Sequence, residues 1–322
     1  MKIVKDLNEI VHNRNSAVTV GTFDGVHLGH REIIRKLNAV KESNDLRSVI
    51  VTFDPHPQIV LRNRDHDIKI LSTLKEKLEI FRELNIDLVY VINFTKEFSL
   101  TPAERFYKDY LIDRIGLKDL ILGYDHMFGK NREGNFKTLK ELSENFDFTV
   151  DKVDEYKPGG EHISSTVIRH LLEKGDVEKA SDLLGRYYSL EGKVVKGKKL
   201  GREIGFPTAN IQVDDEFKLI PKTGIYATEV ILGADKFYGM MNIGTNPTVT
   251  DDESIKIEVN IFDFDKDIYG EDIKVNLTDY IREEKKFKSL EELMENISGD
   301  KKKILKLKLI IFIRKLWIKL KY

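Results

Sequence analysis

Short apolar runs alternate with helical patterns over the first half of the chain. Five apolar runs, each followed by glycine or polar residues, predict buried strands over residues 17–21, 47–53, 87–94, 118–123 and 146–153. Between them, apolar residues recur at helical spacing over 31–41, 74–84, 102–115 and 136–146. Strands that alternate with helices of this length predict an α/β fold with a parallel, doubly wound sheet.

Polar loops follow four of these strands. They read GTFDGVHLGH, TFDPHP, NFTKEF and GYDHMFGKNREG. In an open α/β sheet, ligands bind in the crevice beyond the carboxyl ends of the strands. We therefore expect one cleft that is lined by all four loops.

The pattern changes after about residue 185. Short, often alternating runs lie at 189–197, 224–232, 236–244, 255–264 and 271–281. They predict a small antiparallel β-barrel or sandwich. A helix is expected over 289–297, with Ser289 as its N-cap and Glu292 at the capping-box position.

The change of pattern sets the expected domains. The boundary is expected near Leu184–Arg186. The predicted parts are a first domain over 1–184, a second over 185–303, and a basic, apolar tail over 304–322.

Composition excludes several classes of site. The 322 residues suffice for two domains, and the net charge of -1 gives no overall attraction to nucleic acid. The chain has no cysteine, which excludes disulfides, thiolate metal sites and a cysteine nucleophile. We see no signal peptide and no apolar run of the roughly 18 residues that span a bilayer. We expect a cytoplasmic protein.

The tail KKKILKLKLIIFIRKLWIKLKY, residues 301–322, permits several interpretations. As a helix it is hydrophobic nearly all round, and as a strand its LKLKL stretch alternates. It would serve as an interfacial anchor on anionic lipid, as an extra element docked on the barrel, or as an oligomer contact. An altered reading frame at the end of the gene would also produce such a tail. Membrane contact is expected only through this tail, and no feature indicates an oligomeric state.

Two histidines, His27 and His30, follow the loop GTFDG at the start of an expected helix. A helix N-terminus presents free N–H groups that suit phosphate, and residues i and i+3 share a helical face. Gly29 leaves room for a ligand to approach the backbone. The motif predicts a nucleotide site that stabilises charge on the α-phosphate.

Two alternative roles for these histidines stay open. They are solvated side chains at a helix start, or zinc ligands whose remaining partners are not evident. The motif is neither a P-loop nor a dinucleotide-binding glycine motif.

Two further segments add candidate residues to this site. The prolines around His56 fix an extended loop, and a rigid turn is the simpler alternative. The cluster Ser164, Ser165 and Thr166 starts a helix, which capping alone would explain.

The second domain carries a different pattern. The loop KGKKLGREIG, residues 196–205, would wrap phosphates with backbone N–H groups, or it is a plain surface turn. In the FPTAN segment that follows, Thr208 and Asn210 point to one side of an extended chain. A hydroxyl and an amide oxygen suit Mg²⁺ that is shared with nucleotide phosphates.

Glu258 lies in the alternating strand KIEVNIF. It should face away from Ile257 and Val259 and could act as a general base in a cleft. The alternative is an exposed strand glutamate.

Several motifs together resemble one family. GTFDGVHLGH resembles the HxGH signature of nucleotidyltransferases. It is followed in order by FDPHPQIVL, GYDHMFGKNREG, ISSTVIRHLLEKGDVEKASDLLGR and GREIGFPTANI. Over about residues 15–300 the chain is similar to bacterial bifunctional riboflavin kinase/FMN adenylyltransferases. The resemblance implies a nucleotidyltransferase domain followed by a riboflavin kinase-like barrel.

For the first domain, the resemblance implies transfer of AMP from ATP to FMN, which gives FAD and pyrophosphate. His27 and His30 would hold the ATP phosphates, with His56 and Pro57 beside the flavin. The remaining residues implied at the nucleotide are Gly21, Phe23, Asp24, Gly25, Asp125, Ser164, Ser165, Thr166 and Arg169.

For the second domain, the resemblance implies phosphorylation of riboflavin by ATP. Thr208 and Asn210 would bind Mg²⁺ with ATP, and Glu258 would take the proton of the riboflavin 5′-hydroxyl. Arg282 is a candidate flavin contact, or a surface arginine. The implied phosphate loop contains Gly197, Lys199, Gly201, Arg202 and Gly205. Flavins are substrates and products here, and small molecules are the expected partners.

One departure from the family pattern matters. Relatives often have arginine where Met127 stands, and Lys130 and Arg132 are the nearby cations. Three hypotheses follow: a bifunctional enzyme, an enzyme with one working half, and a flavin- or nucleotide-binding regulator. A binding module need not keep a base, so the presence of His27, His30, Thr208, Asn210 and Glu258 together argues against the regulator.

Overall fold

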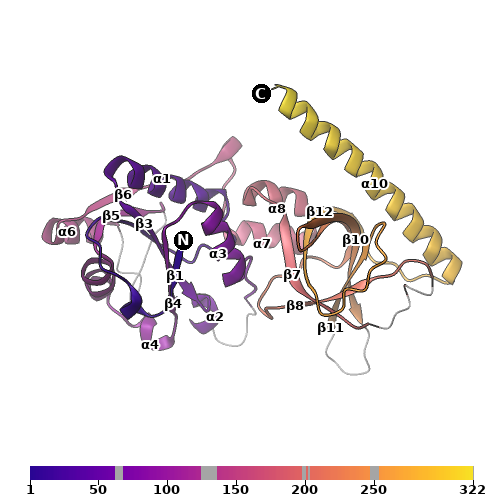
Figure 1. Ribbon diagram of the computed structural model, residues 1–322, viewed down its shortest axis with the longest axis horizontal. Helices are drawn as coiled ribbons and strands as arrows, with labels where there is room; N and C mark the ends of the chain where they lie inside the picture. The colour runs from indigo at the N-terminus through magenta and orange to yellow at the C-terminus, as the bar shows by residue number, and fades with distance from the viewer. Residues whose placement is uncertain (62–67, 125–135, 198–200, 202–203, 247–253, 322) are drawn as a thin grey trace. The chain divides into compact units, whose positions relative to one another are not determined.

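The computed structural model describes the chain except residues 62–67, 125–135, 198–200, 202–203, 247–253 and 322, and it describes only the backbone over 309–321. The chain divides into two compact units (Figure 1). The first contains Met1–Val167 with Phe217–Leu219, and the second contains Ile168–Glu216 with Ile220–Tyr322.

The first unit contains a six-stranded sheet in the order β1-β4-β3-β2-β5-β6, and all of its recorded pairings are parallel. This confirms the predicted doubly wound sheet. The strands are β1 (Lys2–Val4), β2 (Ser16–Val20), β3 (Arg47–Asp54), β4 (Leu88–Asn93), β5 (Leu117–Leu122) and β6 (Thr149–Lys152). The sequence did not predict β1, because three residues are too few to show a pattern.

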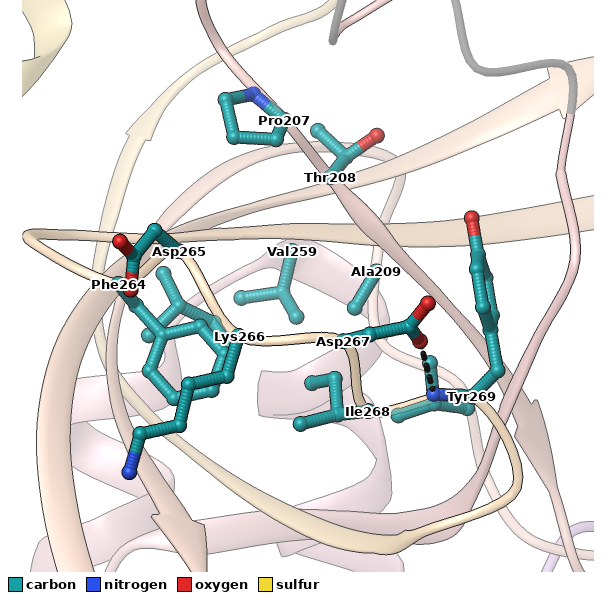
Figure 2. A pocket seen from close by; sticks show the side chains of 12 residues that line it. Pro207, Thr208, Ala209, Val259, Phe264, Asp265, Lys266, Asp267, Ile268 and Tyr269 are labelled. Atoms are coloured by element: carbon teal, nitrogen blue, oxygen red, sulfur yellow. Dashed lines mark hydrogen bonds between the residues drawn. The ribbon is translucent and has the colours of Figure 1, made fainter.

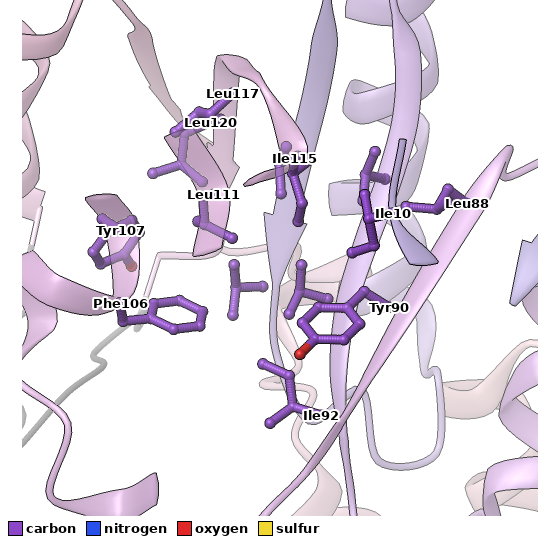
Figure 3. Close-up of a cluster of buried hydrophobic side chains, with 14 of the residues drawn as sticks. Ile10, Leu88, Tyr90, Ile92, Phe106, Tyr107, Leu111, Ile115, Leu117 and Leu120 are labelled. Carbon is purple, nitrogen blue, oxygen red and sulfur yellow. The ribbon is translucent and has the colours of Figure 1, made fainter. Parts of the chain in front are cut away.

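Both faces of this sheet are buried, which explains the continuous apolar runs. Val49 and Val51 of β3 belong to the cluster that contains Phe106 and Leu111 (Figure 3). Between them, Ile50 belongs to the opposite cluster, with side chains of the helices α1 (Leu28–Asn44) and α3 (Leu74–Glu83). The alternation of the strand therefore feeds two separate cores.

Three predicted helices are present as α1 (Leu28–Asn44), α3 (Leu74–Glu83) and α6 (Phe136–Phe146). The helix predicted over 102–115 instead begins as α5 (Ala103–Arg105) and continues as a π-helical segment, Phe106–Ile115. Gly116 ends it at φ 89°, where a Cβ atom would lie 2.1 Å from the carbonyl oxygen of Asn13. The unit also contains α2 (Pro57–Leu61), α4 (Lys96–Ser99) and two single turns, Leu7–Glu9 and Pro158–Gly160.

The second unit contains a closed barrel in the order β10-β11-β8-β7-β12-β9, with antiparallel pairings. This confirms a barrel rather than a sandwich. The strands are β7 (Tyr188–Val195), β8 (Ala209–Val213), β9 (Gly224–Leu232), β10 (Asp235–Asn246), β11 (Ser254–Ile261) and β12 (Asp272–Arg282).

Two helices precede the barrel, α7 (Ser165–Lys174) and α8 (Val177–Leu184). Helix α8 packs against β7 and β12. The boundary expected at Leu184–Arg186 falls between α8 and β7, whereas the compact units divide inside α7. As a division between functional domains, it stays a prediction.

The last helix is longer than the sequence predicted. It begins as expected, and the Ser289 hydroxyl accepts from Glu292 N at 3.2 Å, but α10 continues over Leu290–Lys321. The Glu292 carboxylate accepts from Lys288 N rather than from Ser289 N, so the predicted capping box is only half formed. The strand interpretation of the tail is wrong.

Contacts with the barrel explain why Gly299 does not end α10. Asp300 forms an ion pair with Arg282 at 2.7 Å, and Ile304 is 2% exposed within a cluster that contains Ile225 and Phe262. This packing outweighs the low helix propensity of one glycine. Over the part of the chain that the structure describes, no helix meets the length and apolarity needed to cross a membrane.

The first unit includes a three-residue segment, Phe217–Leu219, from the second half of the sequence. Residues 217–219 run beside Ile70, with hydrogen bonds from Ile70 N to Phe217 O and from Leu219 N to Ile70 O. Lys218 Nζ lies 2.7 Å from Glu76 Oε2 and 2.8 Å from Leu71 O. The side chains of Lys218 and Glu76 are only 2% and 6% exposed, so each charge depends on the other for compensation.

Lys218→Met should lower the free energy of unfolding of the first unit by about 3–5 kcal/mol, because it leaves the buried Glu76 carboxylate without a cation. Urea denaturation measures this loss. Lys193→Met is the control: it removes an exposed ion pair with Asp272 and should cost less than about 1 kcal/mol. Equal losses for the two variants would contradict the role of the buried pair.

Two carboxyl groups meet where α8 packs on the barrel. Glu178 lies in the first turn of α8, and Asp279 lies beside an irregularity in the pairing of β12 with β9. The hydrogen bond between the two carboxyl groups raises the pKa of Glu178 to about 7, and burial adds to the rise. Glu178 therefore holds its proton more tightly in the folded chain than in the unfolded chain.

This raised pKa gives stability that is present below the ordinary pKa of glutamate and is lost as pH rises through about 7. Glu178→Gln should therefore be more stable than the wild type at pH 8, with a flatter dependence of stability on pH. Thermal unfolding between pH 4.5 and 8 measures both. Glu173→Gln, at an exposed position on α7, should leave the dependence unchanged. A Glu178→Gln profile parallel to that of the wild type would rule out this coupling.

Candidate functional site

The loop GTFDG connects β2 to α1 at the point where the strand order of the sheet reverses. β2 pairs with β3 on one side and with β5 on the other. Crossovers leave to opposite sides of a sheet at such a point, and a crevice forms beyond the strand ends. The predicted location of the first site at this loop therefore agrees with the topology.

Buried hydrogen bonds hold the loop in a strained backbone conformation. Phe23 and Val26 have φ values of 49° and 39°, in the left-handed region. Asp24 is 2% exposed, and its Oδ1 accepts from Leu71 N at 2.9 Å and from Ser72 N at 3.1 Å. The Asp24 carboxylate is thus engaged inside the protein, where it fixes the loop. Gly21 lies against the ring of Phe23, and a Cβ there would approach that ring to 3.1 Å.

The two histidines form one stacked unit. Their ring centroids lie 3.7 Å apart with an interplanar angle of 16°. His27 is the N-cap of α1, and its Nδ1 accepts from His30 N at 3.3 Å. A Cβ on Gly29 would lie 3.2 Å from the same Nδ1, so glycine gives the imidazole its place. His27 is 6% exposed, so it is not a solvated surface histidine.

The start of α7 reaches the same loop. Ser164 Oγ accepts from Val167 N at 3.3 Å, which confirms capping, and Ser165 Oγ donates to the carbonyl oxygen of Asp24 at 2.9 Å. The structure thus brings the N-terminal ends of α1 and α7 to one loop. Thr166 is exposed, and Arg169 lies further along α7, in the portion that belongs to the second unit.

The FDPHP segment differs from its prediction. Pro57 begins the short helix α2 instead of continuing an extended loop, because a fixed φ suits the first helical position. His56 Nδ1 accepts from Gln58 N at 3.2 Å, so His56 acts as a local cap. Both residues are half-buried at the end of β3.

Sequence reasoning missed Lys77. Its Nζ donates to the carbonyl oxygens of Thr22 at 3.2 Å and Phe53 at 3.3 Å, and burial lowers its pKa. It ties together the loops that follow β2 and β3. The signal in the sequence is a lysine on the apolar face of the helix at 74–84, three residues after Leu74.

Six residues discussed for the two sites lie outside the described residues: Asp125, Met127, Lys130, Arg132, Lys199 and Arg202.

A polar row crosses the barrel in the second unit. Glu258 of β11 pairs directly with Asn210 of β8 and with Asn242 of β10. Residues that lie directly opposite each other point to the same face of a sheet. Glu258 Oε1 lies 2.7 Å from Lys256 Nζ, and Thr208 Oγ1 donates to it at 3.5 Å.

Glu258 lines a cavity of about 380 Å³. With its side chain 22% exposed, it is not an open strand glutamate. Charged, polar and apolar groups share its wall. The apolar lining residues are Ile204, Phe206, Ile225, Met240, Phe287, Leu293 and Ile297.

A second cavity, of about 530 Å³, lies beside Pro207 and Thr208 (Figure 2). Its wall includes Phe264 and Tyr269 from the connection between β11 and β12. Asp267 Oδ1 accepts from Tyr269 N at 3.1 Å and shapes this connection. Thr208 lines both cavities, so the two meet at the PTAN segment.

Glycines leave room around that segment. A Cβ on Gly197 would lie 2.2 Å from Asn210 Nδ2, and one on Gly201 would lie 2.4 Å from the carbonyl oxygen of Phe206. Gly205 has φ 78°, which disfavours other residues. The glycines of the predicted phosphate loop therefore leave the space that the segment with Thr208 and Asn210, the candidate metal ligands, occupies.

Arg282 is not a surface arginine. It lines the smaller cavity with its side chain 17% exposed. Its Nε and Nη2 lie 2.9 Å and 2.7 Å from Asp300 Oδ2, and its guanidinium lies 5.8 Å from the ring centre of Phe287. This fixed geometry orients a cation and an aromatic ring at one end of the cavity.

Asp24→Ala should destabilise the first unit by about 1–3 kcal/mol for each of the two backbone amides that it leaves buried and unpaired. Chemical denaturation measures the loss. Asp24→Asn keeps an acceptor oxygen and should lose clearly less. If both variants match the wild type, the carboxylate does not hold the loop.

Two family models match the chain. The model described as FAD synthetase matches residues 9–167, and the model described as riboflavin kinase matches residues 184–308. Most of the tail, residues 309–322, lies beyond both matches.

Relatives of known name match along most of the chain. A bifunctional riboflavin kinase/FMN adenylyltransferase of Listeria monocytogenes is 38% identical, over 89% of this chain and 90% of the relative. A protein of the same name from Escherichia coli is 35% identical, over 93% of this chain and 96% of the relative.

A solved structure also matches both halves. It is named a macrolide-efflux protein, from Streptococcus pneumoniae, and is 32% identical, with a TM-score of 0.85 over 93% of this chain and 97% of that one. Its name refers to efflux, which neither family description mentions. With the two family models and the named relatives in agreement, the chain belongs to the family of bifunctional riboflavin kinase/FMN adenylyltransferases.

Proposed function

We propose that the chain makes two flavin nucleotides in succession. The barrel transfers the γ-phosphoryl group of ATP to riboflavin and gives FMN. The first unit then transfers the adenylyl group of a second ATP to FMN, which gives FAD and pyrophosphate. One observation carries the kinase assignment: the Glu258 carboxylate lies beside Lys256 and Thr208, where two cavities meet.

The positions of the two cavities suggest which substrate each one takes. A general base must contact the group that it deprotonates, so riboflavin belongs in the smaller cavity with Glu258. The apolar wall, with Phe206, Met240 and Phe287, suits a flat aromatic ring system. ATP then takes the larger cavity on the other side of Thr208.

The proposed kinase step is a direct transfer. Glu258 accepts the proton of the riboflavin 5′-hydroxyl while the 5′-oxygen forms a bond to the γ-phosphorus of ATP. The bond from the γ-phosphorus to the bridging oxygen breaks, and ADP leaves. The Lys256 ammonium lies 2.7 Å from the Glu258 carboxylate and adds positive charge beside the transferred group. Positioning and charge stabilisation supply most of the catalysis in such a transfer.

Thr208 and Asn210 fit a magnesium ion. They offer a hydroxyl and an amide oxygen, which are hard ligands, and Thr208 lies where the nucleotide and acceptor cavities join. The close fit of the Asn210 amide against Gly197 holds that ligand in place. When bound, Mg²⁺ neutralises phosphate charge.

The proposed adenylyl transfer takes place at the histidine pair. A phosphate oxygen of FMN attacks the α-phosphorus of ATP, and pyrophosphate leaves. His27 and His30 donate hydrogen bonds to the phosphates at the N-terminus of α1, where free N–H groups add positive potential. The Ser165 hydrogen bond keeps the start of α7 at the same loop.

The assembled base argues for catalysis over a binding module. A regulator that only binds flavin has no use for a carboxylate paired with a cation between two cavities. An enzyme with one working half remains the competing proposal, because Met127 bears on the adenylyltransferase alone.

Smaller assignments complete the proposal. We assign the adenylyltransferase to residues 1–184 and the kinase to residues 185–303. We assign the protein to the cytoplasm, with small-molecule partners, and propose that any membrane contact is made through residues 304–322.

A product assay tests both activities: FMN and FAD are resolved by chromatography after incubation with riboflavin, ATP and Mg²⁺. Glu258→Gln should slow FMN formation by about 10²–10⁴-fold, since it removes the base. His27→Asn keeps a capping side chain but loses the imidazole, and should slow FAD formation from supplied FMN by about 10²–10³-fold. Each variant should leave the other activity intact.

Glu271→Gln is the control, because this exposed glutamate lies outside both cavities. If the wild type forms FMN but no FAD, even when FMN is supplied, only the kinase assignment would survive. Neither product from folded protein would overturn the enzyme proposal.

A further inference from the structure

We propose that the side-chain amide of Asn242 selects the sugar chain of the flavin, by accepting a hydrogen bond from the 4′-hydroxyl. This hydroxyl neighbours the one that is phosphorylated. The inference rests on the kinase reaction proposed above and names a specificity-determining residue for it.

Asn242 holds a central place in the smaller cavity. It lies on β10, directly opposite Glu258 on β11 and Ile225 on β9, and all three line the cavity. Side chains that are directly opposite on antiparallel strands have Cβ atoms about 4.5–5.5 Å apart. The amide is therefore one side-chain spacing from the carboxylate that takes the 5′-hydroxyl proton.

The Asn242 amide oxygen is buried and accepts no hydrogen bond within the part of the chain that the structure describes. Its polar neighbours are engaged. Glu258 pairs with Lys256, and Asn260 Nδ2 donates to the carbonyl oxygen of Pro207 at 2.6 Å. A buried oxygen without a donor is unfavourable unless a ligand supplies one.

The order of polarity along the barrel matches that of the substrate. The row runs from the Glu258 base to the Asn242 amide, then to apolar Ile225, and ends at Arg282, which stacks on Phe287. From its reactive end, riboflavin presents the 5′-hydroxyl, further hydroxyls and then the ring system. With the 5′-hydroxyl at Glu258, the 4′-hydroxyl is the next donor and meets Asn242.

The ring N–H group of the flavin is a poorer match for Asn242. It lies at the far end of the ring system from the phosphorylated hydroxyl, whereas Asn242 is adjacent to the base. The geometry therefore favours a hydroxyl donor of the sugar chain.

The test compares riboflavin with 4′-deoxyriboflavin as kinase substrates, at saturating ATP and Mg²⁺ with the full chain. The wild type should prefer riboflavin in kcat/KM by about 10- to 100-fold, because the analogue leaves the amide oxygen unpaired. Asn242→Leu should reduce this preference to within about threefold, chiefly by slowing riboflavin, as coupling between the two groups requires.

Two controls separate recognition from general damage. Asn276→Leu changes an asparagine that bonds to Glu229 outside the cavity, and should keep the wild-type preference. The ratio of kcat/KM for riboflavin to kcat/KM for 2′-deoxyriboflavin should be the same in Asn242→Leu as in the wild type.

Equal kcat/KM values of the wild type for riboflavin and the 4′-deoxy analogue would overturn the proposal, and this result needs no variant. An undiminished preference in folded Asn242→Leu would overturn it as well. In both cases riboflavin is still phosphorylated, so the kinase assignment survives. Failure of the wild type to phosphorylate riboflavin would instead overturn the kinase assignment and this inference together.

Discussion

The short ladder between β8 and β11 is the contact on which the barrel site depends. It aligns Asn210 with Glu258 and Ala209 with Val259. A slip by one residue would turn every side chain of β8 to the other face of the sheet. Thr208 would then leave the junction of the two cavities, and the amide of Asn210 would leave Gly197. The position of the hydroxyl, the amide and the carboxylate is therefore a property of strand register more than of any single side chain.

The loop site depends on a different constraint, which is backbone conformation. Phe23 and Val26 adopt left-handed φ values that side chains disfavour. Asp24 compensates by accepting two backbone amide hydrogens from residues 71 and 72, and Lys77 secures the carbonyl oxygen of Thr22. The residues that hold this loop are therefore buried, and the histidines proposed to bind phosphate follow directly after it. Such strain persists only where surrounding groups over-determine it.

Patterns of two kinds were readable in the sequence. Runs buried on both sides predicted the strands of the parallel sheet, and alternation around Ile257 and Val259 correctly oriented Glu258. Local signals failed where distant contacts decide. The last helix was predicted only over 289–297, but Asp300 and Ile304 bind its continuation to the barrel. The role of Lys77 was not predicted because its hydrogen-bond partners lie in loops distant in sequence. The strand register that places Asn242 opposite Glu258 cannot be predicted from either strand alone.

The placement of Lys218 bears on how the two halves could be separated. The riboflavin kinase family model spans residues 184–308, yet the lysine that neutralises Glu76 is supplied from inside that span. A gene cut at the predicted boundary would deliver a first fragment that contains a buried carboxylate and lacks its cation. Modular design of this enzyme, such as grafting its adenylyltransferase alone, therefore requires a compensating change at Glu76. The two compact units are interleaved in sequence, so no single cut separates them.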